Sequence, residues 1–294
     1  MKTAAKPWIW LIPLGALLLV VFGYPIVEIV RLSFTDATMV SGEPYSYTGS
    51  AYRSVVTGPD FADTLRVTFL FVVFSVVFQL LLGLLIALLV DNAKHRGLRG
   101  AMVTRTVVLT AWAIPGVVIG VIWQLLYQES TSGILNYLGS LLGFSGDSAF
   151  LSDPGNALVS VTIANVWRGT AFSMILMYAG LQTVQRDLLE AARLDGAGPF
   201  QAFRAVTLPA LLPLIAIDLV TITVETFNSF DMIMALTKGG PGTSTQVLAL
   251  KVYDQIFTQL GLGRGAAMSI VLLLINAVMI AIYFRYHKRR EVNP

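Results

Sequence analysis

Five polar or charged side chains inside apolar stretches carry the first chemical signal of this sequence. Asp218, Thr221, Glu225 and Asn228 follow one another at spacings of 3, 4 and 3 residues. That spacing gathers them on one face of a helix. Arg168 lies in an earlier apolar stretch, at a depth that makes a pair with Asp218 sterically plausible. Such groups can line a watery path for a polyhydroxylated solute, or hold ions or protons.

The composition places these side chains in a membrane. Hydrophobic residues make up 55% of the chain and charged residues only 13%, whereas a soluble domain carries about a quarter charged residues. The mean hydropathy is +0.73 and the pI is near 9.2. Because Lys and Arg sit at the ends of the apolar runs, the basic balance indicates membrane topology and no nucleic-acid partner.

Charged side chains inside a bilayer are costly and are functional candidates by default. The polar face formed by Asp218, Thr221, Glu225 and Asn228 cannot contact lipid. It either packs against other helices as a structural ion-pair network or lines a solute path. We predict that these four residues, with Arg168, belong to a translocation path or its gate.

Six apolar runs are long enough to cross the roughly 30 Å hydrocarbon layer as helices. Each must be helical, because lipid offers no hydrogen-bond partner to exposed backbone groups. We predict an all-α integral membrane protein with six transmembrane helices in a single transmembrane domain over residues 1–294. Kinks are expected at Pro13, Pro25, Pro115 and Pro213. The runs lie at approximately 8–31, 65–90, 103–127, 157–182, 208–235 and 266–286.

Lys and Arg are distributed unevenly between the two sides of these spans. Thirteen fall on the side of the termini and of the connection at 183–207, against six on the opposite side. The positive-inside rule then places both termini and this connection in the cytoplasm. A cleaved signal peptide is the alternative for the N-terminus. We expect a retained anchor instead, because the apolar run continues past Gly23 without a small-x-small cleavage site.

Several kinds of chemistry are excluded. The chain has no cysteine, and its two histidines, His95 and His287, stand alone in basic stretches. Disulfides and thiolate chemistry are therefore absent, and no metal site is expected. The glycines from Gly261 to Ala266 lack the Lys-Ser/Thr of a P-loop. We predict that the chain is not an enzyme, has no catalytic residue and holds no cofactor of its own.

The polar connection between the fourth and fifth runs has the features of a helix–turn–helix. A helix over 185–194 is expected to end at Gly196, because glycine readily takes the left-handed conformation common at helix C-caps. Pro199 can open a second short helix, on which Phe200 and Phe203 share one face. Two aromatics presented to water indicate a partner surface, although an ordinary amphipathic connector has the same features.

The residue order of this connection resembles the EAA coupling loop of the membrane subunits of binding-protein-dependent ABC importers. In that family the loop seats in a groove on the ATPase subunit. The resemblance implies the MetI-like permease fold and a coupling role for loop 183–207. The matching residues are Glu190, Ala191, Ala192, Asp195, Gly196, Phe200, Phe203 and Pro209.

Further motifs narrow the resemblance to carbohydrate-uptake permeases of the maltose-transporter type, over roughly residues 10–286. Two positions depart from the pattern of that family: Ala51 stands where Asn usually precedes the tyrosine, and Val67 where Asn often precedes the threonine. These departures weaken any transfer of family contacts in the first external loop. The matching motifs are Gly133-Ile-Leu-Asn136, Asn165-Val-Trp-Arg168, Ala179-Gly-Leu-Gln182, Phe227-Asn-Ser-Phe-Asp231 and Leu236-Thr-Lys-Gly-Gly-Pro241.

The resemblance implies a translocation subunit that imports a sugar or sugar-like solute by alternating access. Two separate ATPase subunits would hold ATP and Mg. The other implied partners are a second homologous permease, an extracytoplasmic solute-binding protein and the lipid of a bacterial or archaeal cytoplasmic membrane. The alternative is an ion-coupled secondary transporter that uses Asp218, Glu225 and Arg168. Uptake driven by an ion gradient, without ATPase subunits, would favour that alternative.

Overall fold

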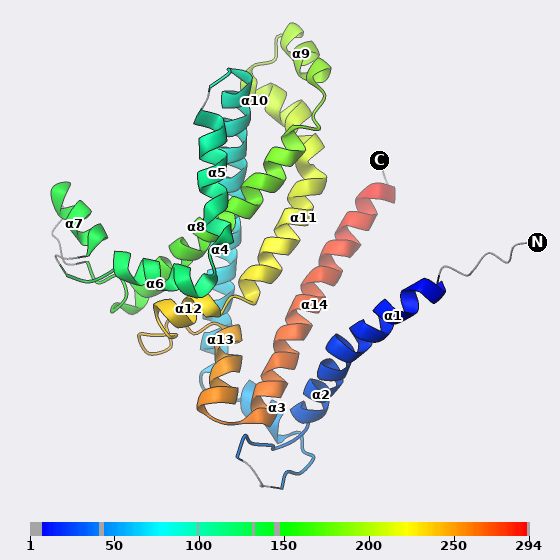
Figure 1. The fold of residues 1–294 in the computed structure, drawn as a ribbon, viewed down its shortest axis with the longest axis vertical. Helices are drawn as coiled ribbons and strands as arrows, with labels where there is room; N and C mark the ends of the chain where they lie inside the picture. Colours follow the sequence, from blue (N-terminus) through cyan, green and yellow to red (C-terminus); the bar gives the residue numbers. More distant parts are fainter. Residues whose placement is uncertain (1–7, 41–43, 99, 131–132, 144–147, 293–294) are drawn as a thin grey trace, which may run out of the picture. The chain divides into compact units, whose positions relative to one another are not determined.

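The computed structural model describes residues 8–40, 44–98, 100–130, 133–143 and 148–292 (Figure 1). Within these ranges every regular element is a helix, and one isolated bridge pairs Thr35 with Tyr47. The all-α prediction is therefore confirmed. The chain divides into two compact units, Met1–Asp63 with Lys251–Val278, and Thr64–Leu250 with Met279–Pro294. The extent of the single permease domain expected over 1–294 stays a prediction.

Several helices of the described chain are suited to crossing a membrane. Four stretches are long and apolar enough: Leu11–Ser33, Phe61–His95, Pro199–Phe227 and Leu262–Arg285. A fifth is added if α5 (Gly100–Ala113) and α6 (Gly116–Leu126) count as one broken span.

The predicted run at 157–182 forms helix α8 (Pro154–Leu181). This helix is long enough to cross a membrane but not apolar enough to join the other candidates. Half of its residues are buried within the chain, so it depends less on contact with lipid. A multi-span helical protein is confirmed, while the count of six crossings stays a prediction.

In the first unit, one long helix runs from α1 (Trp8–Leu18) through a π-helical turn (Leu19–Gly23) into α2 (Tyr24–Ser33). The π turn ends just before Pro25. Proline has no N–H and its ring crowds the preceding turn of an α-helix. A wider turn at this place accommodates the proline without ending the helix.

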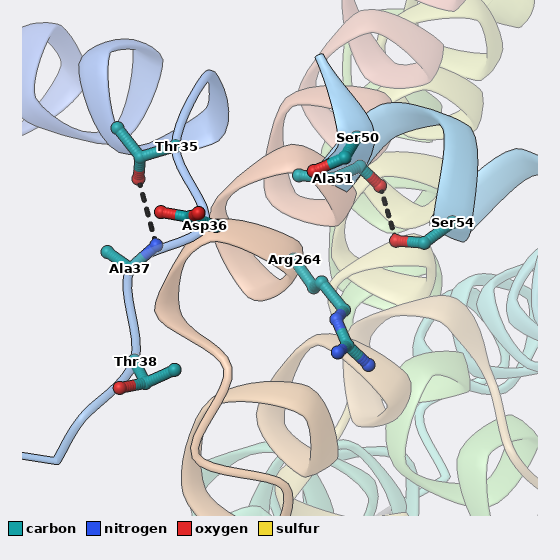
Figure 2. A pocket seen from close by; sticks show the side chains of 8 residues that line it. All are labelled: Thr35, Asp36, Ala37, Thr38, Ser50, Ala51, Ser54 and Arg264. Atoms are coloured by element: carbon teal, nitrogen blue, oxygen red, sulfur yellow. Dashed lines mark hydrogen bonds between the residues drawn. The ribbon is translucent and has the colours of Figure 1, made fainter. Parts of the chain in front are cut away.

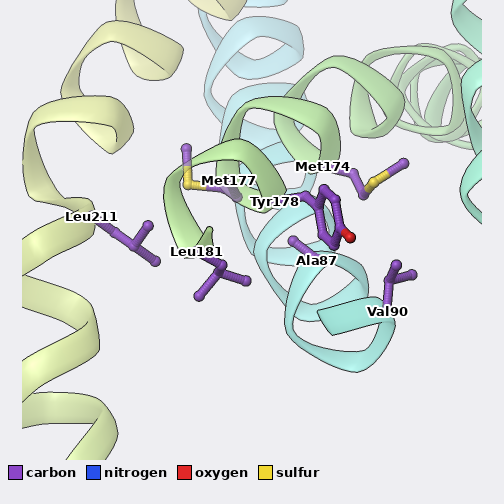
Figure 3. Close-up of a cluster of buried hydrophobic side chains, with 7 residues drawn as sticks. All are labelled: Ala87, Val90, Met174, Met177, Tyr178, Leu181 and Leu211. Carbon is purple, nitrogen blue, oxygen red and sulfur yellow. The ribbon is translucent and has the colours of Figure 1, made fainter. Parts of the chain in front are cut away.

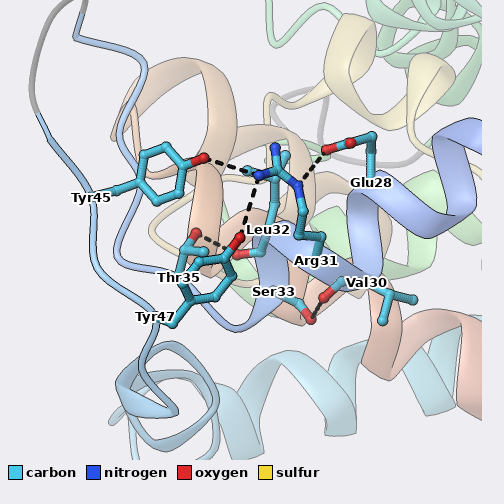
Figure 4. A network of polar contacts seen from close by, with 8 residues as sticks. All are labelled: Glu28, Val30, Arg31, Leu32, Ser33, Thr35, Tyr45 and Tyr47. Carbon is cyan, nitrogen blue, oxygen red and sulfur yellow. Dashed lines mark hydrogen bonds and ion pairs between the residues drawn. The ribbon is translucent and has the colours of Figure 1, made fainter.

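Arg31 ties the segment after α2 back to that helix (Figure 4). Its Nε donates to the Glu28 carboxylate at 2.8 Å, and its Nη1 donates to the hydroxyls of Tyr45 at 3.0 Å and Tyr47 at 3.5 Å. The bridge between Thr35 and Tyr47 adds a backbone pairing. Arg31 thus links Tyr45 and Tyr47 to the end of α2.

A small polar pocket lies in the same unit, beside α3 (Ser50–Val56) and the beginning of α14 (Leu262–Val292). Within it, the Asp36 carboxylate accepts from the Ser46 N–H at 2.6 Å and from the Ser46 hydroxyl at 2.8 Å. These hydrogen bonds hold the pKa of Asp36 below its usual value. The lining residues are Thr35, Asp36, Ala37, Thr38, Ser50, Ala51, Ser54 and Arg264 (Figure 2).

The second unit is built on α4 (Phe61–His95), α5, α8 and α11 (Leu208–Phe227), which lie alongside one another (Figure 1). Helix α8 contacts both α5 and α11. The buried apolar cluster drawn in Figure 3 joins α4, α8 and α11. Its members are Ala87, Val90, Met174, Met177, Tyr178, Leu181 and Leu211.

Helix α4 approaches α8 closely at Gly83. A Cβ atom at this position would lie 2.8 Å from the Met174 backbone nitrogen and 2.9 Å from the Ser173 carbonyl carbon. Small residues allow helix backbones to approach in this way. Nearby, the Gln79 side-chain amide donates to the Asn165 carbonyl of α8 at 3.1 Å. These contacts set the position of α8 and of the side chains that it carries.

Two predicted spans are interrupted. The run at 103–127 bends by 105° between α5 and α6, because Pro115 has no N–H and disfavours a helical conformation in the residue before it. The run at 208–235 ends as α11 at Phe227 and resumes as the short helix α12 (Asp231–Leu236). By contrast, Pro13 and Pro213 lie inside helices that continue past them.

The two short helices that follow these breaks pack against each other. The glycine-spaced stretch from Gly116 to Gly120 on α6 faces α12: a Cβ on Gly116 would overlap the Asp231 carboxylate, and one on Gly120 would lie 2.6 Å from the Met232 carbonyl oxygen. The absence of a side chain at these two glycines therefore allows α6 and α12 to approach closely.

Candidate functional site

The loop that resembles a coupling loop begins with helix α9 (Arg186–Leu194). The helix ends in a Schellman motif: the Gly196 N–H donates to the Arg193 carbonyl at 3.0 Å and the Ala197 N–H to the Ala192 carbonyl at 2.9 Å. Gly196 has φ +83°, the left-handed conformation expected from the sequence. The turn is therefore fixed by backbone geometry that glycine adopts without strain.

The second half of the loop starts at Pro199, as predicted, with helix α10 (Pro199–Ala202). The Gln201 side chain reaches back and accepts from the Gly198 N–H at 2.9 Å, which satisfies one donor of the helix N-terminus. A π-helical turn (Phe203–Thr207) then leads into α11 just before Pro209. This turn repeats the arrangement seen before Pro25.

The loop exposes a large apolar surface. Leu194 is 88% exposed, Phe200 is 74% exposed and Leu188 is 52% exposed. Figure 1 shows α9 projecting beyond the ends of α5, α8 and α11. Of the eight predicted coupling residues, Glu190, Ala191, Asp195, Gly196, Phe200 and Pro209 are exposed, and Ala192 and Phe203 are half-buried.

The predicted polar face of α11, formed by Asp218, Thr221, Glu225 and Asn228 and called the polar stripe from here on, divides into a buried part and an exposed part. Asp218 is 0% exposed, Thr221 is half-buried, and Glu225 and Asn228 are exposed. The hydroxyl of Thr221 donates to the Ile217 carbonyl at 2.9 Å, and the Asn228 amide donates to the Val224 carbonyl at 2.7 Å. A carboxylate and an amide are thus displayed on the outside of a helix apolar enough to span a membrane.

Asp218 points into the interior between α8 and α11. Neither of its carboxylate oxygens has a hydrogen-bond partner, although the Ser173 hydroxyl of α8 is near enough to influence the carboxylate. The Ser173 hydroxyl is itself buried without a partner. Buried polar groups of this kind are costly unless satisfied, which sets this position apart from the apolar core around it.

The expected pair between Arg168 and Asp218 is not formed. The carboxylate oxygens of Asp218 accept no hydrogen bond, whereas the charge of Arg168 acts on Glu225. The sequence argument placed Arg168 and Asp218 at the same depth. In the structure Ser173, five residues further along α8, lies beside Asp218, and Arg168 lies nearer to the exposed part of the stripe at Glu225.

Ser173 and Gln79 are among the buried polar side chains that were not singled out from the sequence. Ser173 lies beside Asp218, and Gln79 of α4 bonds the Asn165 carbonyl of α8. Both are almost completely buried. An isolated glutamine in an apolar run is the same signal that identified Asp218. A serine in such a run is too common to be singled out.

Polar side chains hold several parts of the connection after α6. Asn136 on α7 (Ile134–Leu141) bonds the Ser148 backbone, accepting from its N–H at 3.2 Å. The Glu129 carboxylate accepts from the N–H groups of Leu151 at 2.6 Å and Ser152 at 2.7 Å. The Gly-Ile-Leu-Asn motif singled out in the sequence therefore positions this connection.

In this helical membrane protein, a helix–turn–helix projects between the two long helices α8 and α11. These are the features of a transporter's membrane subunit. Residues 79–292 match the family of binding-protein-dependent transport system inner membrane components. The chain therefore belongs to this family.

Two relatives and one solved structure extend the comparison. The trehalose/maltose transport system permease protein MalF of Thermococcus litoralis is 32% identical over 99% of this chain and 96% of its own length. The sulfoquinovosyl glycerol transport system permease protein SmoG of Agrobacterium fabrum is 32% identical over 96% of this chain and 90% of its own.

A bacterial alginate ABC transporter, solved with an alginate pentasaccharide-bound periplasmic protein, has a similar fold. Its matching chain has a TM-score of 0.81 at 20% identity, over 96% of this chain and 93% of that one. The fold is therefore that of the MetI-like ABC importer permeases, and the chain is a permease subunit that contributes to a translocation pathway.

Proposed function

We propose that this permease imports a sugar or sugar-like solute and is driven through loop 183–207 by separate ATPase subunits. It crosses a bacterial or archaeal cytoplasmic membrane six times, with both termini and the loop in the cytoplasm. ATP and Mg are bound by the ATPase subunits, and this chain holds no cofactor. The excess of Lys and Arg on the side of the loop supports this orientation.

The observation that carries the proposal is the apolar surface of the loop. Leu194 and Phe200 are among the most exposed large apolar side chains of the described chain, and they lie on a loop whose turn is fixed by Gly196. A rigid, exposed apolar surface in water is typical of a protein interface. A groove on an ATPase subunit would cover it, and movement of that subunit would move α9 and α10.

The solute class is supported by two different facts. Relatives at 32% identity over nearly the whole chain are named for transport of trehalose, maltose and sulfoquinovosyl glycerol. The exposed carboxylate of Glu225 and the amide of Asn228 offer hydrogen-bonding groups suited to hydroxyls. We assign Arg168, Asp218, Thr221, Glu225 and Asn228 to the path or its gate, next to a second homologous permease. The solute arrives on an extracytoplasmic binding protein.

The proposal is tested by isolating the full chain from its native membrane in mild detergent and identifying the proteins that accompany it. We expect a second permease and a P-loop ATPase, with ATP hydrolysis in the purified complex. Phe200→Ala is expected to release the ATPase while leaving the permease pair intact. Removal of a buried aromatic anchor from an interface typically costs about 2 kcal/mol or more.

Phe69→Ala is the matched control. Phe69 is 63% exposed, similar to Phe200, but lies on α4 far from the loop in sequence. This variant is expected to retain the ATPase. A native complex with no nucleotide-hydrolysing subunit, together with uptake driven by an ion gradient alone, would overturn the proposal.

A further inference from the structure

Gln182 lies where α8 meets the coupling loop. This residue caps the C-terminus of α8 and directly precedes the loop; its N–H donates to the Ala179 carbonyl at 3.2 Å. It is the last residue of the Ala-Gly-Leu-Gln motif, to which the function described above gives no role. Along the chain, displacement of α9 reaches α8 through this position.

The Gln182 amide joins α8 to α4 with both of its polar atoms. Its Oε1 accepts from Lys94 Nζ at 2.8 Å, and its Nε2 donates to Asp91 Oδ1 at 2.7 Å. The other oxygen of Asp91 lies 3.2 Å from His95 Nε2. An amide is the neutral group that can satisfy an ammonium and a carboxylate at the same time. Because both partners are charged, each hydrogen bond is stronger than a neutral one.

Tyr178, one helical turn before Gln182, extends the connection to α5. The Lys94 ammonium lies 5.9 Å from the centroid of the Tyr178 ring, and the Arg105 guanidinium of α5 lies 5.8 Å from it. Both distances are within the range of cation–π attraction. The C-terminal ends of α4 and α8 and the N-terminal half of α5 therefore lie together where the loop begins.

We propose that Gln182 is a positioning residue that transmits movement of the coupling loop to α4 and α5. The inference rests on the proposed function of the loop. Without this connection, force on α9 would bend the chain at 182–185, where no regular helix continues. With it, the loop and the end of α4 move together.

The exposure of the groups argues that stability is not their main contribution. Gln182 and Lys94 are exposed and Asp91 is half-buried, and polar pairs at a surface contribute little to stability. Substitutions here are therefore expected to leave a folded permease. Their effect should be seen in the transmission of movement.

The experiment uses the intact complex in nanodiscs with one engineered cysteine, Asn92→Cys, at the end of α4. The natural chain has no cysteine to interfere. The labelling rate of Cys at this position by a maleimide is measured with and without ATP, together with ATP hydrolysis and the amount of bound ATPase. No solute is required. In the otherwise unchanged complex, ATP is expected to alter the labelling rate.

Gln182→Leu is expected to abolish that ATP-dependent change while the ATPase stays bound and active. Gln182→Glu should also abolish it, because its carboxylate repels Asp91. Adding Asp91→Asn to Gln182→Glu should restore it: the new amide can donate to the new carboxylate, which also pairs with Lys94. Gln124→Leu, at an exposed glutamine of α6 outside the loop, is the control and should behave as the unchanged complex.

An ATP-dependent change that persists in Gln182→Leu would overturn the inference and leave the proposed function standing. The absence of a change in the unchanged complex, with the ATPase bound, would also overturn it. Failure of the double variant to recover, with normal amounts of complex in the membrane, would show that the hydrogen-bond arrangement is not the cause. Absence of any ATPase from the unchanged complex would instead reject the proposed function.

Discussion

Arg168 of α8 acts electrostatically on Glu225 of α11 and does not bond the more deeply buried Asp218. Neutralising Arg168 should therefore destabilise the chain less when Glu225 is already neutral. The same should hold for Glu225 when Arg168 is already neutral. We expect a double-mutant cycle of Arg168→Gln and Glu225→Gln, followed by thermal unfolding in detergent, to give a coupling of about 0.5–1 kcal/mol.

The corresponding cycle of Arg168→Gln and Asp218→Asn serves as the comparison. Its effects should add, because the two side chains share no hydrogen bond. A larger coupling for Arg168 with Asp218 than with Glu225 would contradict the arrangement described.

The second prediction concerns the left-handed turn at Gly196 and its effect on binding of the ATPase. With φ +83° it occupies a conformation that costs a residue with a Cβ about 1–2 kcal/mol. Gly196→Ala should weaken binding of the ATPase by at least about fivefold, because part of the binding energy is then used to restore the turn. The measurement is titration of the permease complex with its ATPase subunit.

Gly198 provides the matched control two residues away. Its φ is −68° and a Cβ there would lie 3.7 Å from the nearest atom, Gln201 Oε1. Gly198→Ser should bind the ATPase as the natural chain does. Equal affinities for the Gly196 and Gly198 variants would show that the turn geometry does not matter for docking.

Gly83 tests the contact between α4 and α8. A Cβ would collide with the backbone at Ser173 and Met174, which cannot move aside as a flexible side chain can. Gly83→Ala is expected to lower the stability of the purified protein by about 1–3 kcal/mol, seen as a lower midpoint of thermal unfolding. Gly15→Ala, at a helix position with no atom within 4 Å, should leave that midpoint unchanged.

The stability of the connection after α6 should depend on pH through the carboxyl group of Glu129. Partial burial raises the pKa of its carboxyl, but the hydrogen bonds from Ser152 and Leu151 lower it more, and the net shift is downward. A lowered pKa in the folded protein means that the bonds stabilise the connection above the usual pKa of glutamate. That stabilisation is lost as the pH falls through the lower folded value.

Hydrogen exchange of the Leu151 and Ser152 amides should therefore show protection near neutral pH that is lost only below the usual pKa of glutamate, about 4.3, after correction for intrinsic rates. In Glu129→Gln the side chain cannot titrate, so any remaining protection should not depend on pH. Protection in the natural chain that is already lost above that usual pKa would contradict this assignment.

Local sequence rules predicted the loop well. Gly196, Pro199 and the helix between 186 and 194 follow from preferences of single residues at helix ends, which do not depend on the rest of the fold. Recognition of the family required only the order of the loop residues and the motifs around it. The coupling role of these residues stays a prediction.

Contacts between helices could not be predicted in the same way. The partner of Arg168 depends on how α8 is positioned along and around its axis against α11, and hydrophobic periodicity fixes neither when a helix is buried on several sides. The bend at Pro115 was expected as a kink, although its size of 105° was not. The break after Phe227 was read as part of a continuous span, because composition alone does not distinguish a bent apolar segment from a straight one.

The bend of 105° between α5 and α6 also limits how the second unit can deform. Helix α6 lies against α12 through Gly116 and Gly120, and α12 follows α11 after only three residues. Helices α5 and α11 are therefore joined at one end by the contact between α6 and α12, the short helices that follow them. Tilting α11 without moving α5 would require this contact to break.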